Sequence, residues 1–312
     1  MLNVEQMPGI CLDGMSDEEW RARRLGCIGG SEIGAILGFN QYKTALQVYK
    51  EKRGLSHLAD ISDKDAVYWG TVLEPVVANE FARRTGKKVA VLSKILFHPE
   101  HPYMTANIDR DICGEDAGLE CKTCSAYGKD EWEGEEIPAS YILQCQWYMM
   151  VSGASLWYIA CLIGGQSFKW KPLKRDDELI EIMENAAVDF WENHVLPGIP
   201  PLASAGDIKE FDVKVPDTIR LPDTANNLLI DLMAAKESYS TAEKKKKDLE
   251  AKVKQLLDGH SKGVTGMFRV SWTQSEYLRF DETAFKAANP ALAGGYQKVV
   301  KRDNGVKVEM VG

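Results

Sequence analysis

Two spacings of apolar residues alternate along the first 195 residues of the 312-residue chain. A repeat of three to four predicts helices over Trp69–Arg84 and Tyr141–Val151. Segments with the composition of strands are interspersed with these helices: Lys88–Phe97, Met104–Ile112, Leu119–Lys122 and Leu156–Ile163. The last of them is apolar throughout, as in a strand buried on both faces. This order predicts an α/β fold with a central mixed sheet flanked by helices.

A segment rich in proline, glycine and serine, from Leu196 to Gly206, interrupts this pattern. We therefore expect two domains, residues 1–200 and residues 201–312. Capping signals also place two helices near the N-terminus. Ser16-Asp-Glu-Glu19 is a capping box, and Gly30 to Gly38 is a glycine-rich turn leading into a short apolar helix.

A heptad pattern dominates the second domain between Pro222 and Asp258. Its seam positions alternate spacings of three and four, and only Lys246 among them is charged: Ala225, Leu228, Leu232, Ala235, Tyr239, Ala242, Lys246, Leu249, Val253 and Leu256. Such a repeat is typical of a coiled-coil helix. The pattern leaves three partners open, namely another subunit, a different protein, or the helix's own domain.

Short strands are predicted after this helix, over Val264–Trp272 and Tyr277–Phe280. Asn304-Gly305 lies between two valine-rich pairs, which predicts a β-hairpin. Residues 201–312 are therefore expected to form a module of one long helix and hairpins that serves assembly or partner binding.

Composition narrows the class of protein. No apolar run is long enough to span a membrane, and the N-terminus has no secretory pattern, so we expect a cytoplasmic location. Seven cysteines indicate reduced thiols. The net charge is −8, but basic residues prevail from Trp20 to Arg53 and acidic ones from Asp111 to Glu136. That asymmetry suits a protein that binds phosphates in one place and metal ions in another.

The chemical signal lies in Asn107-Ile-Asp109 and, eleven residues after Asp109, Glu120-Cys-Lys122. Side chains alternate along a strand, so Glu120 and Lys122 point to one face while Cys121 points away. With Asp109 on the adjacent strand, two carboxylates and one amine converge. Carboxylates bind Mg²⁺, which activates a water for phosphodiester hydrolysis. Lys122 is expected to orient that water, to take part in its deprotonation, or to offset charge in the transition state. Metal ions nearby and partial desolvation are expected to disfavour its ammonium form, which suits proton transfer.

Other residues outside this triad give weaker signals. Cys121-Lys-Thr-Cys124 lacks the second cysteine pair that an iron–sulfur cluster needs. His98-Pro-Glu-His101 lies in a predicted loop without the ligand spacing of a zinc site. We expect neither centre.

The chain resembles the YqaJ-like viral recombinase family, which is related to the λ-type phage exonuclease and to the PD-(D/E)xK nuclease superfamily with its restriction-endonuclease-like core. The resemblance covers about half of the chain, from Glu18 to Phe168, and consists of five blocks in order: Arg24–Gly34, Trp69–Glu74, Thr105–Asp109, Leu119–Lys122 and Tyr141–Gln146.

The resemblance implies a role for each matched residue. Asp109, Glu120 and the Cys121 carbonyl would bind Mg²⁺, for which Mn²⁺ is expected to substitute. Glu74 would be an outer or second metal ligand, and Lys122 the catalytic lysine.

It implies further roles outside the metal centre. Gln146 would hold Lys122 or the attacking water, and Arg24 and Ser31 would bind the 5′-terminal phosphate of DNA.

The activity so implied is 5′→3′ digestion of one strand of linear duplex DNA, which leaves 3′ overhangs for phage-type recombination. The expected partners are double-stranded DNA ends, further copies of the chain in a homo-oligomeric ring, and a single-strand annealing protein, with no membrane. A phage or prophage origin in a bacterial host is expected. Two alternatives are a structure-specific DNA endonuclease and a non-catalytic scaffold that binds DNA ends.

Overall fold

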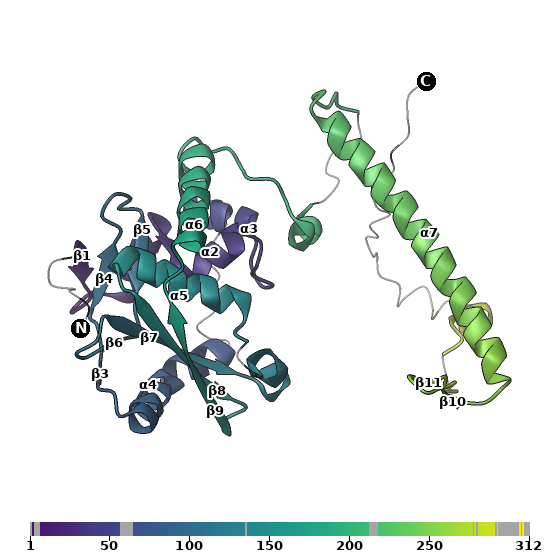
Figure 1. Cartoon of the computed structure of the whole chain (residues 1–312). Coiled ribbons are helices and arrows are strands. Elements are labelled where there is room, and N and C mark those ends of the chain that lie inside the picture. Colours follow the sequence, from purple (N-terminus) through teal and green to yellow (C-terminus); the bar gives the residue numbers. More distant parts are fainter. Residues whose placement is uncertain are drawn as a thin grey trace. The chain divides into compact units, whose positions relative to one another are not determined.

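A computed structural model of the chain forms two compact units, Met1–Lys214 and Val215–Gly312, drawn in Figure 1. It describes residues 2, 7–56, 65–134, 136–211, 218–276, 278, 280–290, 292, 306 and 308. The first unit extends past residue 200, where the sequence predicts a domain boundary. Thr44 donates to Asp207 at 2.5 Å, and this bond ties the short 3₁₀ helix Ala205–Glu210 to the first unit.

A five-stranded sheet forms the larger layer of the first unit. Its order is β3 (Val89–Ala90), β6 (Arg110–Ile112), β7 (Ala117–Cys124), β8 (Leu156–Ile163) and β9 (Ser167–Lys174). Strands β7 and β8 are parallel and the other neighbours are antiparallel. The predicted mixed sheet is therefore confirmed.

A second sheet of four strands was not foreseen. Its order is β1 (Gly9–Cys11), β4 (Lys94–Phe97), β5 (Met104–Asn107) and β2 (Ile28–Gly29). The single strands predicted over Met104–Ile112 and Lys88–Phe97 are wrong, because each segment contributes one strand to each sheet. The first segment bends at Asp109, whose side chain accepts the backbone N–H of Cys121 at 2.8 Å. The composition of a strand does not reveal such a change of partner.

Helices pack on both faces of the five-stranded sheet. Side chains alternate along β8, so that Trp157 and Ile159 join one apolar cluster and Tyr158 and Ala160 the other. The first cluster contains α5 (Ala139–Ser152) together with the four-stranded sheet, and the second contains α4 (Asp65–Thr85). Helix α5 is thus buried between the two sheets, and both helices lie where the sequence predicts them. The remaining helical segments of this unit are α1 (Asp17–Leu25), α2 (Gly30–Ile36), α3 (Ala45–Lys52), η1 (Ala126–Trp132), α6 (Asp177–Asp189) and η2 (Phe190–Val195).

The second unit is built on α7, a continuous helix over Ala225–Leu257 that confirms the helix predicted from the heptad pattern. It is followed by β10 (Lys262–Val264), β11 (Arg269–Ser271) and α8 (Glu282–Ala288). The single strand predicted over Val264–Trp272 is wrong. Strands β10 and β11 instead pair as an antiparallel hairpin. In its turn, the hydroxyl of Thr265 accepts the N–H groups of Met267 and Phe268.

The remaining sequence predictions concern the C-terminal segment. Leu278 and Phe280 are irregular rather than extended in a sheet, and Tyr277 and the predicted hairpin at Asn304-Gly305 lie outside the described residues. Across the described part of the chain, no helix has both the length and the apolar composition to cross a bilayer.

Candidate active site

Two carboxylates and one amine meet where β6 and β7 pair, as their spacing predicts. The antiparallel register pairs Arg110 with Leu119, and one further step brings Asp109 beside Glu120. The Nζ of Lys122 lies 2.5 Å from Oε1 of Glu120. Glu120 is buried, and Lys122 is about one-fifth exposed. The group therefore lies on the inner strands of the sheet, with restricted access to water.

Gln144 on α5 joins the acid to the amine. Its Nε2 donates to Oε1 of Glu120 at 2.8 Å, and its Oε1 accepts from Nζ of Lys122 at 3.0 Å. The same Nε2 lies 2.7 Å from the hydroxyl of Tyr148. Because one amide contacts both side chains, Gln144 fixes the position of Lys122 relative to Glu120.

Gln146, expected to hold Lys122, does not reach it. Its Nε2 donates to the carbonyl of Lys174 at 2.8 Å, and its Oε1 accepts the N–H of Asp176 at 3.0 Å. Residues two apart on a helix point in nearly opposite directions, so only one of the two glutamines can face β7. The expectation that Gln146 holds Lys122 is therefore wrong. The sequence places both residues on one helix but does not give its rotation.

The buried carboxylates are electrostatically unfavourable without a cation. Burial raises the pKa of Asp109 well above its usual range, and the charges of Glu120 and Glu74 raise it further. Within the described part of the chain, Oε2 of Glu120 is buried without a hydrogen-bond partner. Buried anionic oxygens normally have compensating partners. The oxygen donors present therefore fit a hard divalent cation.

Lys122 is charged in this arrangement. Burial alone would lower the pKa of its amine, but the adjacent carboxylate of Glu120 outweighs burial and raises that pKa above its usual value. The ring of Tyr141 also lies 5.0 Å from Nζ, which favours the cation. In the absence of a metal ion, the carboxylate in direct contact therefore favours the ammonium form of Lys122. The expectation that metal ions beside Lys122 disfavour this form stays a prediction.

Glu74 approaches the same site from α4. Its Oε1 accepts from Nη1 of Arg110 at 2.5 Å, and its charge contributes to the raised pKa of Asp109. Cys121 belongs to the apolar cluster on the α4 side, opposite Glu120 and Lys122, as strand alternation requires. Cys124 packs in the cluster on the α5 side, so the two thiols do not converge.

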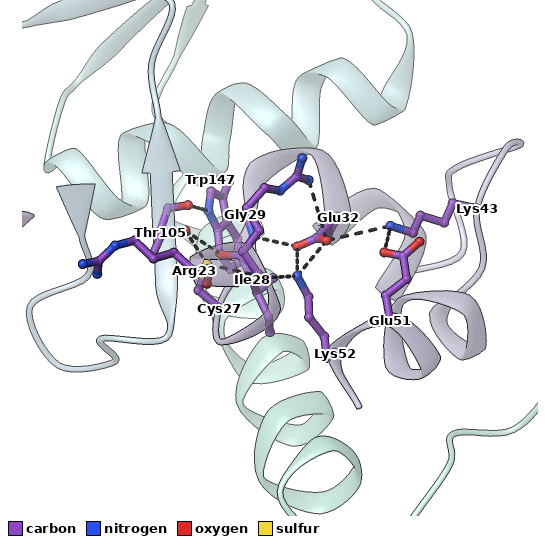
Figure 2. A network of polar contacts seen from close by, with 11 residues as sticks. Arg23, Cys27, Ile28, Gly29, Glu32, Lys43, Glu51, Lys52, Thr105 and Trp147 are labelled. Carbon is purple, nitrogen blue, oxygen red and sulfur yellow. Dashed lines mark hydrogen bonds and ion pairs between the residues drawn. The ribbon is translucent and has the colours of Figure 1, made fainter. Parts of the chain in front are cut away.

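A second polar cluster surrounds Glu32 of α2 (Figure 2). Its carboxylate is 3% exposed and lies 2.8 Å from Nζ of Lys52 and 3.8 Å from both Arg24 and Lys43. Burial works against ionisation of Glu32, but Lys52, Arg24 and Lys43 together lower its pKa. With Glu51, which pairs with Lys43, three cations meet two anions, and the cluster carries an excess positive charge.

The two clusters adjoin through close packing of α2 on α5. A Cβ built on Gly30 would lie 2.8 Å from Cε1 of Tyr148 and 3.3 Å from Cγ of Gln144. A side chain at position 30 would displace the ring of Tyr148, whose hydroxyl contacts Gln144. Ser31 follows directly and is exposed. The structure thus brings the predicted phosphate-binding segment next to the carboxylate site.

His98, His101 and Glu184 place potential metal-ligand atoms within 4.8 Å of one another. No sequence pattern indicates this group, because Glu184 comes from the distant helix α6. However, Nδ1 of His98 accepts the N–H groups of Glu100 and His101. A neutral ring must then carry its proton on Nε2, the nitrogen that lies 3.8 Å from Glu184. We interpret the group as a polar contact between a loop and α6.

Comparisons with known proteins identify one family and several solved structures of low sequence identity. The family model for the YqaJ-like viral recombinase domain matches residues 19–155. A Bacillus subtilis (strain 168) protein described as "Uncharacterized protein YqaJ" is 40% identical over 300 residues, which cover 92% of each chain.

Solved structures are more distant. An alkaline exonuclease from Laribacter hongkongensis is 20% identical with a TM-score of 0.48, over 56% of this chain and 91% of that one. A phage-related exonuclease from Haemophilus somnus 129PT is 14% identical with a TM-score of 0.37, over 54% and 94%.

Proposed function

The chain belongs to the YqaJ-like viral recombinase family, and on that basis we propose that it is a metal-dependent exonuclease acting on linear double-stranded DNA. The observation that carries the proposal is the convergence of Asp109, Glu120 and Lys122 in one partly buried group. Carboxylates beside an amine are the residue types that metal-assisted phosphodiester hydrolysis needs.

Asp109 and Glu120 would hold Mg²⁺, or Mn²⁺ in its place, with the Cys121 carbonyl and Glu74 as further oxygen ligands. The orphaned Oε2 of Glu120 and the raised pKa of Asp109 support this assignment, since both indicate carboxylates in need of a cation. The ion supplies Lewis-acid activation of the phosphate and stabilises charge on its oxygens.

Lys122 acts as an electrostatic and orienting group. Gln144 and Glu120 hold its ammonium beside the carboxylate site. A cation in that position stabilises the negative charge that develops on the phosphate oxygens during cleavage, and it does so without reorganising at the moment of reaction. Gln144 is a positioning residue that takes the role first expected of Gln146.

The direction of digestion along the strand would be set by the cluster around Glu32. Arg24 and Ser31 bind the 5′-terminal phosphate, and the excess cationic charge of Lys43 and Lys52 favours it. Because α2 packs against Gln144, that phosphate is held near the cleavage centre. Digestion then runs 5′→3′ and leaves a 3′ strand for an annealing protein. A ring of several copies enclosing the duplex would keep the enzyme on its substrate.

Digestion of end-labelled linear duplex tests this proposal. With Mg²⁺, the 5′ label is expected to appear first in mononucleotides. The 3′ label is expected to stay on strands that shorten from their 5′ ends, and a chelator is expected to stop digestion. Cleavage of covalently closed circles would instead favour a structure-specific endonuclease. Binding of ends without any release of label would favour a non-catalytic scaffold.

Arg24→Ala is expected to slow digestion of 5′-phosphorylated ends by about tenfold or more, the typical value of a charge-assisted hydrogen bond. Ends that carry a 5′-hydroxyl should be affected much less. Initial rates on the two substrates measure the difference. Arg23→Ala is the matched control, since Arg23 is an exposed arginine of the same helix. Equal losses on both ends would remove the phosphate-binding role.

Asp109→Asn is expected to stabilise the metal-free protein at neutral pH while abolishing cleavage. The raised pKa of Asp109 means that the folded state binds its proton more tightly than the unfolded state. Wild-type stability is therefore lost as pH rises from the ordinary aspartate pKa through the raised value, and asparagine avoids this loss.

Thermal unfolding in chelator measures the effect of Asp109→Asn. The variant should melt several degrees higher at about pH 8, and the difference should shrink toward about pH 4. Asp130→Asn, at an exposed position, is the control. A lower melting temperature for Asp109→Asn at about pH 8 would contradict the electrostatic interpretation.

A further inference from the structure

Along the described helix α7, most of the heptad seam is exposed. Its large apolar side chains are mostly in solvent, with Leu228 67%, Tyr239 72% and Leu256 86% exposed. The 33-residue helix is roughly 50 Å long at 1.5 Å per residue. An apolar stripe of that length is characteristic of an interaction surface. This feature is independent of the nuclease site and lies in the second unit.

We propose that α7 pairs with α7 of a second copy of this chain, antiparallel, in one defined register. Residue sizes along the seam select that register. When Ala242 faces Tyr239 of the second copy, Ala235 faces Lys246 and Ala225 faces Leu256. Each small residue then meets a long one, which fills the interface evenly.

A parallel pair would be poorly matched along the same seam. It would place Ala225, Ala235 and Ala242 each against the same residue of the second copy. The interface would then be underpacked at three positions. It would also set Lys246 against Lys246, which repel each other in a desolvated position. The antiparallel register avoids both defects without any change to the helix.

Charges beside the seam complement each other in this register. Asp231 lies opposite Lys252 of the second copy, and Lys236 lies opposite Glu243 of the second copy. Each contact occurs twice in the symmetric pair. Among the described residues, neither Asp231 nor Lys252 has an ion-pair partner in its own chain. Glu243 already holds Lys247 at 2.9 Å, and its second oxygen can accept Lys236 of the other copy. Lys236 donates one N–H to the carbonyl of Val306 in its own chain, and its ammonium has two further N–H donors for Glu243.

The hairpin β10–β11 gives the C-terminal half of α7 a groove that suits the N-terminal half of another copy. Figure 1 shows this hairpin beside the end of α7. The ring of Trp272 packs 5.2 Å from Nζ of Lys254, and the groove between hairpin and helix exposes Leu249 and Val253. In the proposed register these two residues receive Leu232 and Leu228 of the second copy.

The N-terminal half of α7 is apolar beyond the seam, as a helix lying in a groove requires. Leu229 and Met233 flank Leu228 and Leu232 and widen the apolar stripe. In the C-terminal half of α7, the positions beside the seam are occupied by lysines and glutamates. Only an antiparallel pair places the wide apolar half of each helix against the groove of the other.

Zero-length carbodiimide cross-linking of the full chain tests the pairing. Unlabelled and ¹⁵N-labelled proteins are mixed, exchanged and cross-linked, and peptides that join the two isotopes report contacts between copies. We expect mixed-isotope peptides that link Asp231 to Lys252. Within one helix these residues lie roughly 31 Å apart, so no intrachain reaction can produce that link. Mixed peptides linking Asp231 to Lys236, or no mixed α7 peptides, would overturn the proposal.

Charge reversal gives a second readout through the dissociation constant of the full chain in sedimentation equilibrium. Asp231→Lys alone should weaken association about tenfold, since it creates two repulsive contacts per pair. Combining it with Lys252→Asp should restore the wild-type constant to within about twofold. Lys244→Asp, on the outer face of the helix, should change little. An unaltered constant in Asp231→Lys, or no restoration in the double variant, would refute the register.

Discussion

Lys122→Ala is expected to reduce the rate of duplex digestion by about 10²–10³-fold or more while leaving binding to DNA ends nearly unchanged. The ammonium of Lys122 is held by Glu120 and Gln144 and does not contribute to the Glu32 cluster. Its loss therefore removes stabilisation of the transition state rather than affinity for the end. Single-turnover rates and equilibrium binding in Ca²⁺ or chelator separate the two effects.

Lys129→Ala is the matched control for this experiment, because Lys129 is an exposed lysine of the following segment. Gln144→Ala should give an intermediate loss, since Lys122 remains but is no longer held. If Lys122→Ala digested DNA at the wild-type rate, the assignment of the active site would fail. If Gln144→Ala were silent and Gln146→Ala inactive, the orientation of α5 described here would be incorrect.

Glu32→Ala is expected to destabilise the first unit by about 3–5 kcal/mol, the usual cost of leaving a buried charge without its partner. Lys52 is 1% exposed, and Glu32 is 3% exposed and 2.8 Å away. Removing the carboxylate leaves a buried ammonium beside two other cations. The melting temperature should fall by about 6–20 °C, given about 2–4 °C per kcal/mol for a domain of this size.

Glu80→Ala is the control for this measurement, because Glu80 pairs with Arg83 and Arg84 near the surface and should cost little. The pKa of Glu32 is lowered in the folded protein, so its stabilisation is present above the ordinary glutamate pKa. It is lost as pH falls through the lowered value. The gap between wild type and Glu32→Ala should therefore close in acid, and a gap that widened there would be inconsistent with the ion cluster.

The sequence predicted the site most successfully where its residues share a strand or neighbouring strands. Glu120 and Lys122 are two residues apart, so their common face follows from the pleat alone. The position of Asp109 followed from one further assumption, that its segment pairs with the segment that contains Glu120 and Lys122. Gln144 could not be separated from Gln146, because the choice depends on how α5 is rotated between two sheets. The Glu32–Lys52 contact joins two short helices and has no local signal.

Amino-acid order by itself determined the features that arise within one segment. These are the helical period of α4, α5 and α7, the buried strand β8, the common face of Glu120 and Lys122, and the order of large and small residues along the α7 seam. Local sterics and side-chain periodicity encode all of them.

Tertiary structure alone decided features that depend on packing between distant segments. It divided Met104–Ile112 between two sheets, turned Gln144 rather than Gln146 toward Lys122, and surrounded Glu32 with three cations. Each of these outcomes depends on which surfaces of distant segments pack against one another and are buried from water. The packing is determined by the complete core, since no single segment contains the residues that it will contact.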